Sequence, residues 1–189
     1  RFISIKSRDY AFDRFPVLGE IKTREPVMGR IFEEDEIWSC TTCGACEEEC
    51  PVTIEYIDKV VDLRRAMVDE GMVPQSLQKP LGALEKRGNP YGKMEKKRAD
   101  WVKEMSEDQE IKVLSKKEQA ETLFFVDSAT SYDERLQELA RATTRIFQAC
   151  GADFGVLGKA EKDSGHEVRR FGEEMLFVTL KEHNSKAIL

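Results

Sequence analysis

The sequence predicts a chain of mixed class, α+α/β, in which an all-helical part is followed by a partial parallel α/β part. Up to about residue 105, apolar side chains recur at helical spacing within segments bounded by glycine and proline. From Thr122 onward, short apolar runs of strand length alternate with amphipathic helices, and that order is typical of a parallel sheet. A charged stretch, residues 106–120, is predicted to link the two parts.

The helical domain, residues 31–105, is expected to follow an arm. Residues 1–30 mix aromatic, basic and turn-forming side chains without a sustained period, so we expect an extended arm that packs on something else. A short acidic helix over residues 33–38 is predicted to lead into a cysteine-rich loop. Three further helices are predicted: residues 53–70, with Thr53 as N-cap and Gly71 as stop, residues 74–87, and residues 95–105.

The α/β part, residues 121–189, is predicted to be a truncated half-domain. Strands are expected at residues 122–126 and 153–157, helices at residues 133–150 and 166–183, and the opening of a third strand at residues 187–189. Ligands of such sheets bind beyond the carboxyl ends of the strands. Those ends are a polar turn, residues 127–132, and a loop, residues 158–165.

Four of the five cysteines form one run, Cys40, Cys43, Cys46 and Cys50, which Pro51 follows directly. This C-x2-C-x2-C-x3-C-P spacing is the thiolate pattern of an iron–sulfur cluster. Zinc is the main alternative, but structural zinc sites usually use two pairs of ligands separated by a longer loop. Clustered cysteines without a secretory signal argue against disulfides. The sequence therefore predicts a [4Fe–4S] site in a reducing compartment, with these four cysteines as cofactor and metal ligands.

One run need not complete a cluster by itself. In bacterial ferredoxins with this spacing the fourth cysteine ligates the other cluster of a pair, so Cys40, Cys43 and Cys46 would need a further ligand. Cys150 is the one other cysteine, but its place on an apolar helix face predicts a small buried side chain. We therefore expect a companion cysteine run in a longer polypeptide, and Cys50 either completes the first cluster or ligates its neighbour.

Composition excludes several classes of function. The net charge is −6, and basic residues are interspersed with acidic ones, so no nucleic acid is predicted as a partner. No stretch of the sequence approaches the ~20 apolar residues of a membrane-spanning helix. The sequence shows no nucleophile paired with a base and no phosphate-binding loop, so no catalytic residue is assigned. We expect a cytoplasmic location, with association to the inner face of the membrane through a partner or a missing segment left open.

Three stretches resemble a known family: residues 36–51 with the cysteine run, residues 61–65 (Val-Asp-Leu-Arg-Arg), and residues 88–92 (Gly-Asn-Pro-Tyr-Gly). Over about residues 28–189 the chain resembles the iron–sulfur oxidoreductases of the heterodisulfide reductase D type. The resemblance implies a helical 4Fe-4S ferredoxin domain followed by CCG domains, usually with two cysteine runs upstream of them. It also implies electron transfer with flavoprotein, quinone-linked or thiol partners, and in some members a membrane haem domain.

The chain departs from this family at the strand ends of the α/β part. Residues 127–129 read Asp-Ser-Ala where the family commonly has Gly-Cys-Ala, and residues 163–165 read Asp-Ser-Gly where it has Cys-Cys-Gly or Cys-Thr-Gly. Oxygen is a poor substitute where soft thiolate is wanted. Ser128 and Asp163 are therefore predicted to form at most a degenerate second site.

Two functions follow as expectations. The first is an electron-transfer segment that relays single electrons through one [4Fe–4S] cluster, with a second cluster shared with an unseen segment left open, between a flavoprotein or quinone-linked partner and a catalytic subunit. The second is a scaffolding or docking subunit with a structural metal site and a degenerate redox domain. Arg169 and Arg170 match an arginine pair of the family, and are expected either to brace Asp163 or to face water.

Overall fold

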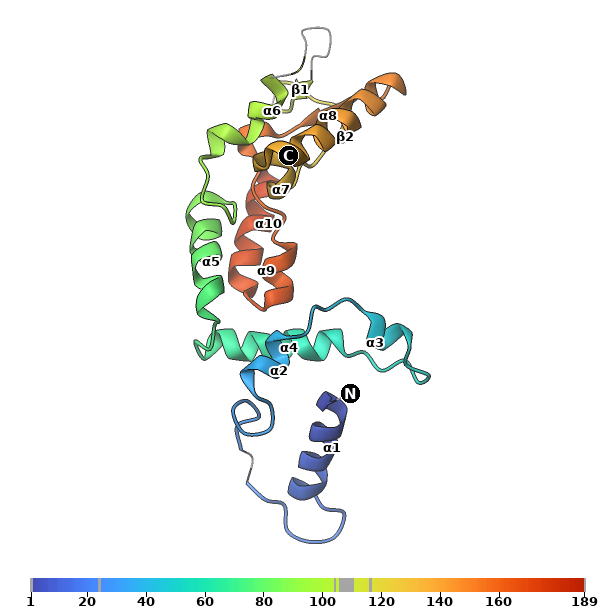
Figure 1. The fold of residues 1–189 in the computed structure, drawn as a ribbon, viewed down its shortest axis with the longest axis vertical. Helices are drawn as coiled ribbons and strands as arrows, with labels where there is room; N and C mark the ends of the chain where they lie inside the picture. The colour runs from blue at the N-terminus through green and yellow to red at the C-terminus, as the bar shows by residue number, and fades with distance from the viewer. Residues whose placement is uncertain (1, 24, 104, 106–110, 116, 189) are drawn as a thin grey trace. The chain divides into compact units, whose positions relative to one another are not determined.

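The computed structural model describes residues 2–23, 25–103, 105, 111–115 and 117–188. The chain divides into two compact units: unit 1 comprises Arg1–Val73 and Arg169–Glu173, and unit 2 comprises Pro74–Val168 and Glu174–Leu189. Helices dominate, and the strands are short (Figure 1). The predicted α+α/β class is confirmed, because a three-stranded parallel sheet accompanies the helices. The predicted boundaries of arm, helical domain, linker and half-domain stay predictions.

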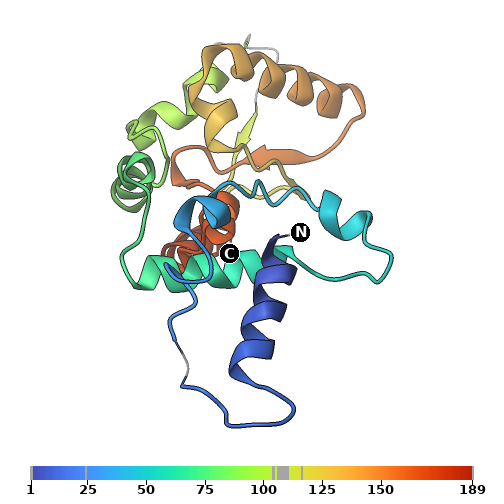
Figure 2. The same ribbon diagram turned by 60° about the horizontal axis from the view of Figure 1, so that its bottom comes forward.

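The core of unit 1 joins two of its helices. Within the described residues the unit contains α1 (Phe2–Arg14), α2 (Glu34–Trp38), α3 (Ala45–Glu48) and α4 (Ile57–Asp69). Its buried side chains are Phe32, Ile37, Val60 and Met67, of which Ile37 comes from α2 and the last two from one face of α4. The cysteine loop, defined as residues 39–56, leaves α2, carries α3 and returns to α4 (Figure 2).

The expectation of an extended arm is wrong for residues 2–14, which form α1. Lys6 Nζ lies 2.6 Å from a carboxylate oxygen of Glu36, and Ser4 Oγ donates to Tyr56 Oη at 2.9 Å. Ile3 packs against the unit 1 core. The two polar partners lie 30 and 52 residues away in the sequence, so a local period could not reveal the helix.

The helix after the cysteines, α4, begins at Ile57 rather than near Thr53. Thr53 has a φ of 49°, in the left-handed region, whereas an N-cap residue takes extended backbone. The Glu47 carboxylate instead accepts a hydrogen bond from the Ile57 N–H, with 2.6 Å between Oε1 and N. The other end is as predicted, because the helix stops before Gly71, whose φ is 76°.

The sheet of unit 2 is parallel, with strand order β1-β3-β2. β2 (Thr122–Leu123) and β3 (Phe154–Val156) confirm the two predicted strands. β1 (Lys112–Val113) lies in the predicted linker, of which residues 106–110 and 116 are outside the described part. Two residues between charged neighbours carry too little periodicity to be recognised as a strand.

Most helices of unit 2 follow the sequence. Within the described residues they include α5 (Gln75–Arg87), the 3₁₀ helix η1 (Glu95–Ala99), α6 (Asp100–Lys103), α7 (Ser128–Tyr132), α8 (Glu134–Ala149) and the 3₁₀ helix η3 (Gly158–Ala160). α5 and α8 confirm predicted helices, whereas the helix predicted at residues 95–105 is divided between η1 and α6. The predicted polar turn is helix α7, because Asp127 Oδ1 accepts a hydrogen bond from the Thr130 N–H and caps it.

The single helix predicted over residues 166–183 is two helices, α9 (His166–Phe171) and α10 (Glu174–Ile188). Gly172 separates them with a φ of 100°. The junction Arg169–Glu173 is part of unit 1. The third strand expected at residues 187–189 is wrong for Ala187 and Ile188, which lie in α10, and Leu189 is outside the described residues.

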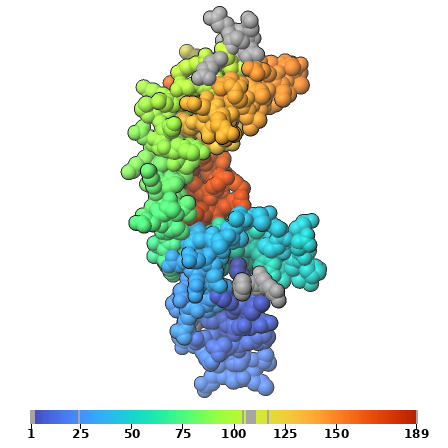
Figure 3. Space-filling model, viewed as in Figure 1, coloured from blue at the N-terminus to red at the C-terminus, as the bar shows by residue number. Residues whose placement is uncertain are grey.

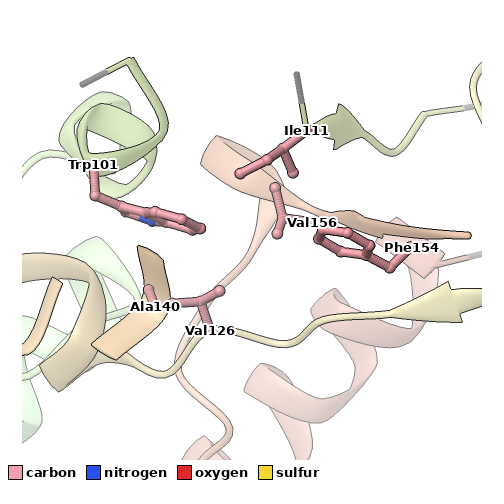
Figure 4. Packing of buried hydrophobic residues seen from close by; sticks show 6 residues of the cluster. All are labelled: Trp101, Ile111, Val126, Ala140, Phe154 and Val156. Atoms are coloured by element: carbon pink, nitrogen blue, oxygen red, sulfur yellow. The ribbon is translucent and has the colours of Figure 1, made fainter. Parts of the chain in front are cut away.

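Figure 4 shows the larger buried cluster of unit 2, formed by Trp101, Ile111, Val126, Ala140, Phe154 and Val156. Phe154 and Val156 are two residues apart on β3, so both point from the central strand into this cluster. Part of the predicted apolar face of α8 stays outside it: Leu136, Leu139 and Ile146 are 40%, 60% and 61% exposed. Cys150, expected to be buried, is exposed because it follows the last residue of α8.

Candidate metal centre

The four predicted ligands lie along the cysteine loop of unit 1. Cys40 and Cys50 are half-buried, whereas Cys43 and Cys46 are exposed. In Figure 3 the teal segment around α3 lies at the surface of the molecule. Among the described residues, no three side chains of His, Cys, Asp or Glu converge on a common metal position. The loop therefore gathers the thiols in one segment without closing them around one point.

The backbone of the loop fits an iron–sulfur cluster in its donor chemistry. Thr42 and Gly44 have φ values of 52° and 85°, so the chain reverses between the cysteines. The Thr42 N–H donates to Cys40 Sγ and the Ile54 N–H donates to Cys50 Sγ, each over 3.4 Å. Amide hydrogen bonds to sulfur are among the features that set cluster potentials. Soft thiolate ligands surrounded by N–H donors are a suitable set for such a cluster.

The pKa of the Cys43 thiol lies below its usual value. The backbone N–H of Ala45 is the largest cause and the Thr41 hydroxyl is the next, with a smaller contribution from the positive charge of Arg170. A lower pKa favours the thiolate, which is the form that binds metal. The loop therefore favours the ligating form of this exposed side chain.

Arg64, in α4, is a buried cation beside the loop. Its Nη2 donates to the carbonyl oxygens of Ile37, at 3.0 Å, and of Cys40. Its guanidinium carbon lies 5.2 Å from the centre of the Trp38 ring. Arg64 Nε and Trp38 Nε1 are buried without a hydrogen-bond partner in the described part of the chain. Buried N–H groups seldom stay unpaired, so these two donors are consistent with an anionic group at the loop.

Arg170, in α9, holds the same loop. Its Nε donates to Thr42 Oγ1 at 2.6 Å, and its Nη2 donates to the carbonyl oxygens of Thr41 at 2.9 Å and Thr42 at 2.6 Å. The neighbouring Phe171 stacks on Trp38 with ring centroids 4.6 Å apart. The structure therefore gives Arg170 neither of its two expected roles, because the half-buried side chain binds the cysteine loop instead of Asp163 or water.

Sequence reasoning did not assign Arg64 to the site, although a signal was present. Arg64 lies four residues after Val60 and three before Met67, on the face of α4 that forms the unit 1 core. Arginine is rarely buried unless it is paired. A cation on an apolar face, soon after a cysteine run, therefore indicates a buried acceptor nearby.

The structure brings the two predicted residues of the second site together, within unit 2. Ser128 Oγ donates to Asp163 Oδ2 at 2.6 Å. Arg98 joins them, because its Nη1 donates to Ser128 Oγ at 3.3 Å and its Nη2 to the Val126 carbonyl oxygen at 2.9 Å. Arg98 also forms an ion pair with Glu161, with 2.7 Å between Nη2 and Oε1. We call Arg98, Ser128, Glu161 and Asp163 the buried ionic cluster.

The buried ionic cluster does not fit an iron–sulfur group. Its ion pair is almost wholly buried, with side-chain exposures of 3% for Arg98 and 2% for Glu161. Burial raises the pKa of Glu161 to about 7, although Arg98 opposes the shift. Ser128 and Asp163 offer oxygen instead of thiolate, and a buried guanidinium already binds the serine. Arg98 and Glu161 were not predicted from the sequence.

Comparison with known proteins identifies the class to which the cysteine loop is similar. Residues 6–54 match a family described as a 4Fe-4S dicluster domain. The chain is 42% identical over 163 residues to the probable iron–sulfur-binding oxidoreductase FadF of Bacillus subtilis, a match that covers 84% of this chain and 23% of that protein. It is 35% identical over 152 residues to the EtfAB:quinone oxidoreductase of Syntrophomonas wolfei, covering 79% of this chain and 21% of that protein.

A third relative is one component of the dihydromethanophenazine:CoB–CoM heterodisulfide reductase of Methanosarcina barkeri. The identity is 28% over 159 residues, covering 82% of this chain and 36% of that protein. The predicted resemblance to iron–sulfur oxidoreductases of this type is thereby confirmed over most of the chain, and so is an iron–sulfur cofactor as its class.

The chain spans less than a quarter of the length of FadF and of the EtfAB:quinone oxidoreductase. No solved structure gives a significant match. Within the described part of the chain, no helix is both long enough and apolar enough to cross a membrane.

Proposed function

From the match of residues 6–54 to a 4Fe-4S dicluster domain, we propose that the chain is the electron-transfer portion of a larger iron–sulfur oxidoreductase. Cys40, Cys43 and Cys46 hold a [4Fe–4S] cluster, and Cys50 completes it or ligates a neighbouring cluster. A cluster held there supplies reversible one-electron chemistry. The observation that carries the proposal is a C-x2-C-x2-C-x3-C-P run on a loop whose amide N–H groups donate to Cys40 and Cys50.

The residues of the loop act on binding and access. Cys40 packs against the unit 1 core, which anchors the start of the loop. Cys43 and Cys46 are exposed, so the face that they form is open to an electron donor or acceptor. The acidic side chains Glu47, Glu48 and Glu49 follow at once, and negative charge on this rim favours a partner with a basic surface.

We propose that the partners are a flavoprotein or a quinone-linked subunit on one side and a catalytic subunit on the other. The name of the Syntrophomonas relative, an EtfAB:quinone oxidoreductase, supports this proposal. Quinones reside in the membrane, so the same proposal places the working protein at the cytoplasmic face of the membrane, where thiolates stay reduced. A membrane haem partner is compatible with it.

The test is anaerobic purification with iron and sulfide analysis, followed by EPR spectroscopy of the reduced protein. The proposal expects brown protein with about four irons per chain and a spectrum that reverses on reoxidation. Cys46→Ser is expected to abolish this iron, while the control Cys150→Ser, at the exposed end of α8, keeps it. Colourless wild-type protein, or equal iron in both variants, would contradict the proposal.

A second function, a scaffolding or docking subunit with a structural metal, is favoured by unit 2. Its buried ionic cluster lacks thiolates, and Leu136, Leu139 and Ile146 expose an apolar stripe on α8. Zinc without iron in protein purified anaerobically would support this function over electron transfer. Reversible bleaching of iron-based absorbance on reduction would exclude it.

A further inference from the structure

Two arginines from separate elements of unit 1 hold the same stretch of the cysteine loop. Arg64 of α4 donates to the carbonyl oxygen of Cys40, and Arg170 of α9 donates to those of Thr41 and Thr42. Three consecutive carbonyl groups are therefore bound by guanidinium groups. They belong to the first cysteine and the two residues after it, of which Thr42 takes a left-handed φ of 52°.

The two arginines are also tied to each other. Arg64 Nη1 donates to the carbonyl oxygen of Arg170 at 3.1 Å. The junction after Arg170 lies close to the backbone of α4, because a Cβ at Gly172 would stand 2.7 Å from Arg65 N and 2.8 Å from the Arg64 carbonyl carbon. Phe171 stacks on Trp38, directly before the loop. The junction 169–173 is thus fitted against both α4 and the start of the loop.

We propose that Arg64 and Arg170 are positioning residues for the cluster, fixing the backbone from Cys40 to Thr42 and raising the reduction potential as permanently charged neighbours. The second half of this statement rests on the proposed function. The first half concerns the protein with or without iron. The α9–α10 junction, which follows the last strand of the sheet in the chain, is in this way a working part of the redox site.

The sign of the effect follows from electrostatics. Reduction adds one negative charge to a cluster, and a nearby cation stabilises that charge, so the potential rises. The effect is larger for a side chain that water does not surround, and Arg64 is 6% exposed. Arginine suits the task because its planar fork reaches several acceptors at once and stays charged, whereas lysine keeps only the charge.

The decisive variants are Arg170→Leu and Arg170→Lys, with Arg145→Leu as the control. Arg145 is an exposed residue of α8 in unit 2, so its removal changes the net charge equally without touching the loop. Arg170 is used because its side chain is only half-buried, and its loss is less hazardous to folding than the loss of Arg64.

The first measurement is a redox titration of each iron-loaded protein, followed by EPR. We expect the midpoint potential of Arg170→Leu to move to more negative values, that of Arg170→Lys to move less, and that of Arg145→Leu to stay at the wild-type value. An unchanged potential in Arg170→Leu overturns the electrostatic part of the proposal. An equal shift in Arg145→Leu also overturns it, because the effect would then be one of net charge.

The second measurement is amide hydrogen exchange of iron-free protein over residues 40–44, compared with residues 134–149 in the same sample. We expect exchange to quicken at residues 40–44 in Arg170→Leu and to stay unchanged over residues 134–149. Unchanged exchange at residues 40–44 overturns the positioning role. Wild-type protein that binds no iron would refute the proposed function and leave this arm intact, so the two failures can be told apart.

Discussion

The cysteine loop of unit 1 and the buried ionic cluster of unit 2 both contain arginine, yet the arginines have opposite kinds of partner. Arg64 and Arg170 donate to main-chain carbonyl groups and to the Thr42 hydroxyl. Arg98 instead forms an ion pair with the carboxylate of Glu161 and donates to Ser128, which is bonded to Asp163. Among the described residues, the first arrangement leaves its positive charges without a carboxylate partner, and the second neutralises its charge internally.

This difference explains why only one of the two sites suits a cofactor. In the cysteine loop, polar side chains bind the backbone, so the thiol groups stay available and two of them are exposed. In the buried ionic cluster, the side chains at the carboxyl ends of the strands bind one another, in the place where parallel sheets usually bind ligands. The comparison therefore predicts that unit 2 depends on Arg98 for stability and not for chemistry.

The largest expected effect comes from Arg98→Ala. Removing one partner of a buried ion pair leaves an uncompensated charge or an unpaired carboxyl group, which typically costs about 3–5 kcal/mol. Peptide-resolved hydrogen exchange of α8 would measure this loss in unit 2. Lys103→Ala is the control, because its ion pair with Asp100 is exposed and such pairs contribute at most about 1 kcal/mol. Equal protection in the two variants would remove the contrast between the sites.

The next largest effect is a dependence on pH that is specific to unit 2. Burial raises the pKa of Glu161 from 4.5 to about 7 in the folded protein. The folded state therefore keeps a proton that the unfolded state releases, and stability present below pH 4.5 is lost as the pH rises through 7. We expect the free energy of unfolding of unit 2 to fall by about 3 kcal/mol over this interval.

Glu161→Gln is the matched variant for this prediction, since glutamine cannot titrate. Denaturant unfolding at pH 4.5, 6 and 8 would be compared between the variant and the wild type. The difference in stability between them should change with pH in the stated direction. A constant difference would show that Glu161 stays ionised beside Arg98 throughout, and that the cluster is a fixed ion pair.

The sequence predicts the two sites unequally well, and the reason is physical. Cys40 to Cys50 carry their chemistry in local spacing, so the cofactor class could be predicted without a fold. The roles of Arg98 and Arg170 depend on partners 63 and 128 residues away, which no local pattern contains. The same limit applies to α1, whose partners are distant, and to β1, which is too short to show a period.

A smaller effect is expected at the glycine that lets the α9–α10 junction approach α4. In Gly172→Ala the Cβ would meet backbone atoms of Arg64 and Arg65 within 2.8 Å, at a φ of 100°. Gly71→Ala is the matched control, because it has a φ of 76° and open space around its Cβ position. Strain of this kind costs about 1–3 kcal/mol, with Gly172→Ala at the upper end.

Hydrogen exchange of α4 and of residues 40–44 would measure this loss in unit 1. The junction is required for the cysteine loop if Gly172→Ala loosens residues 40–44 while Gly71→Ala leaves them near wild type. Loosening to the same degree in both variants would show that only backbone strain matters, and that the close approach of the junction does not.

The smallest expected effect is none at all, from placing thiols where the oxygens of the second site stand. Ser128→Cys combined with Asp163→Cys is expected to add no cluster iron to anaerobically purified protein. Two thiolates would lie beside Arg98 and could pair with it, while the almost wholly buried Glu161 leaves no room for a cluster of metal and sulfide. Iron and sulfide analysis against the unchanged chain measures the outcome. Additional iron in the double variant would mean that the strand ends are a cofactor site that has lost only its ligands, and the contrast between the two regions would then be one of residue type rather than of architecture.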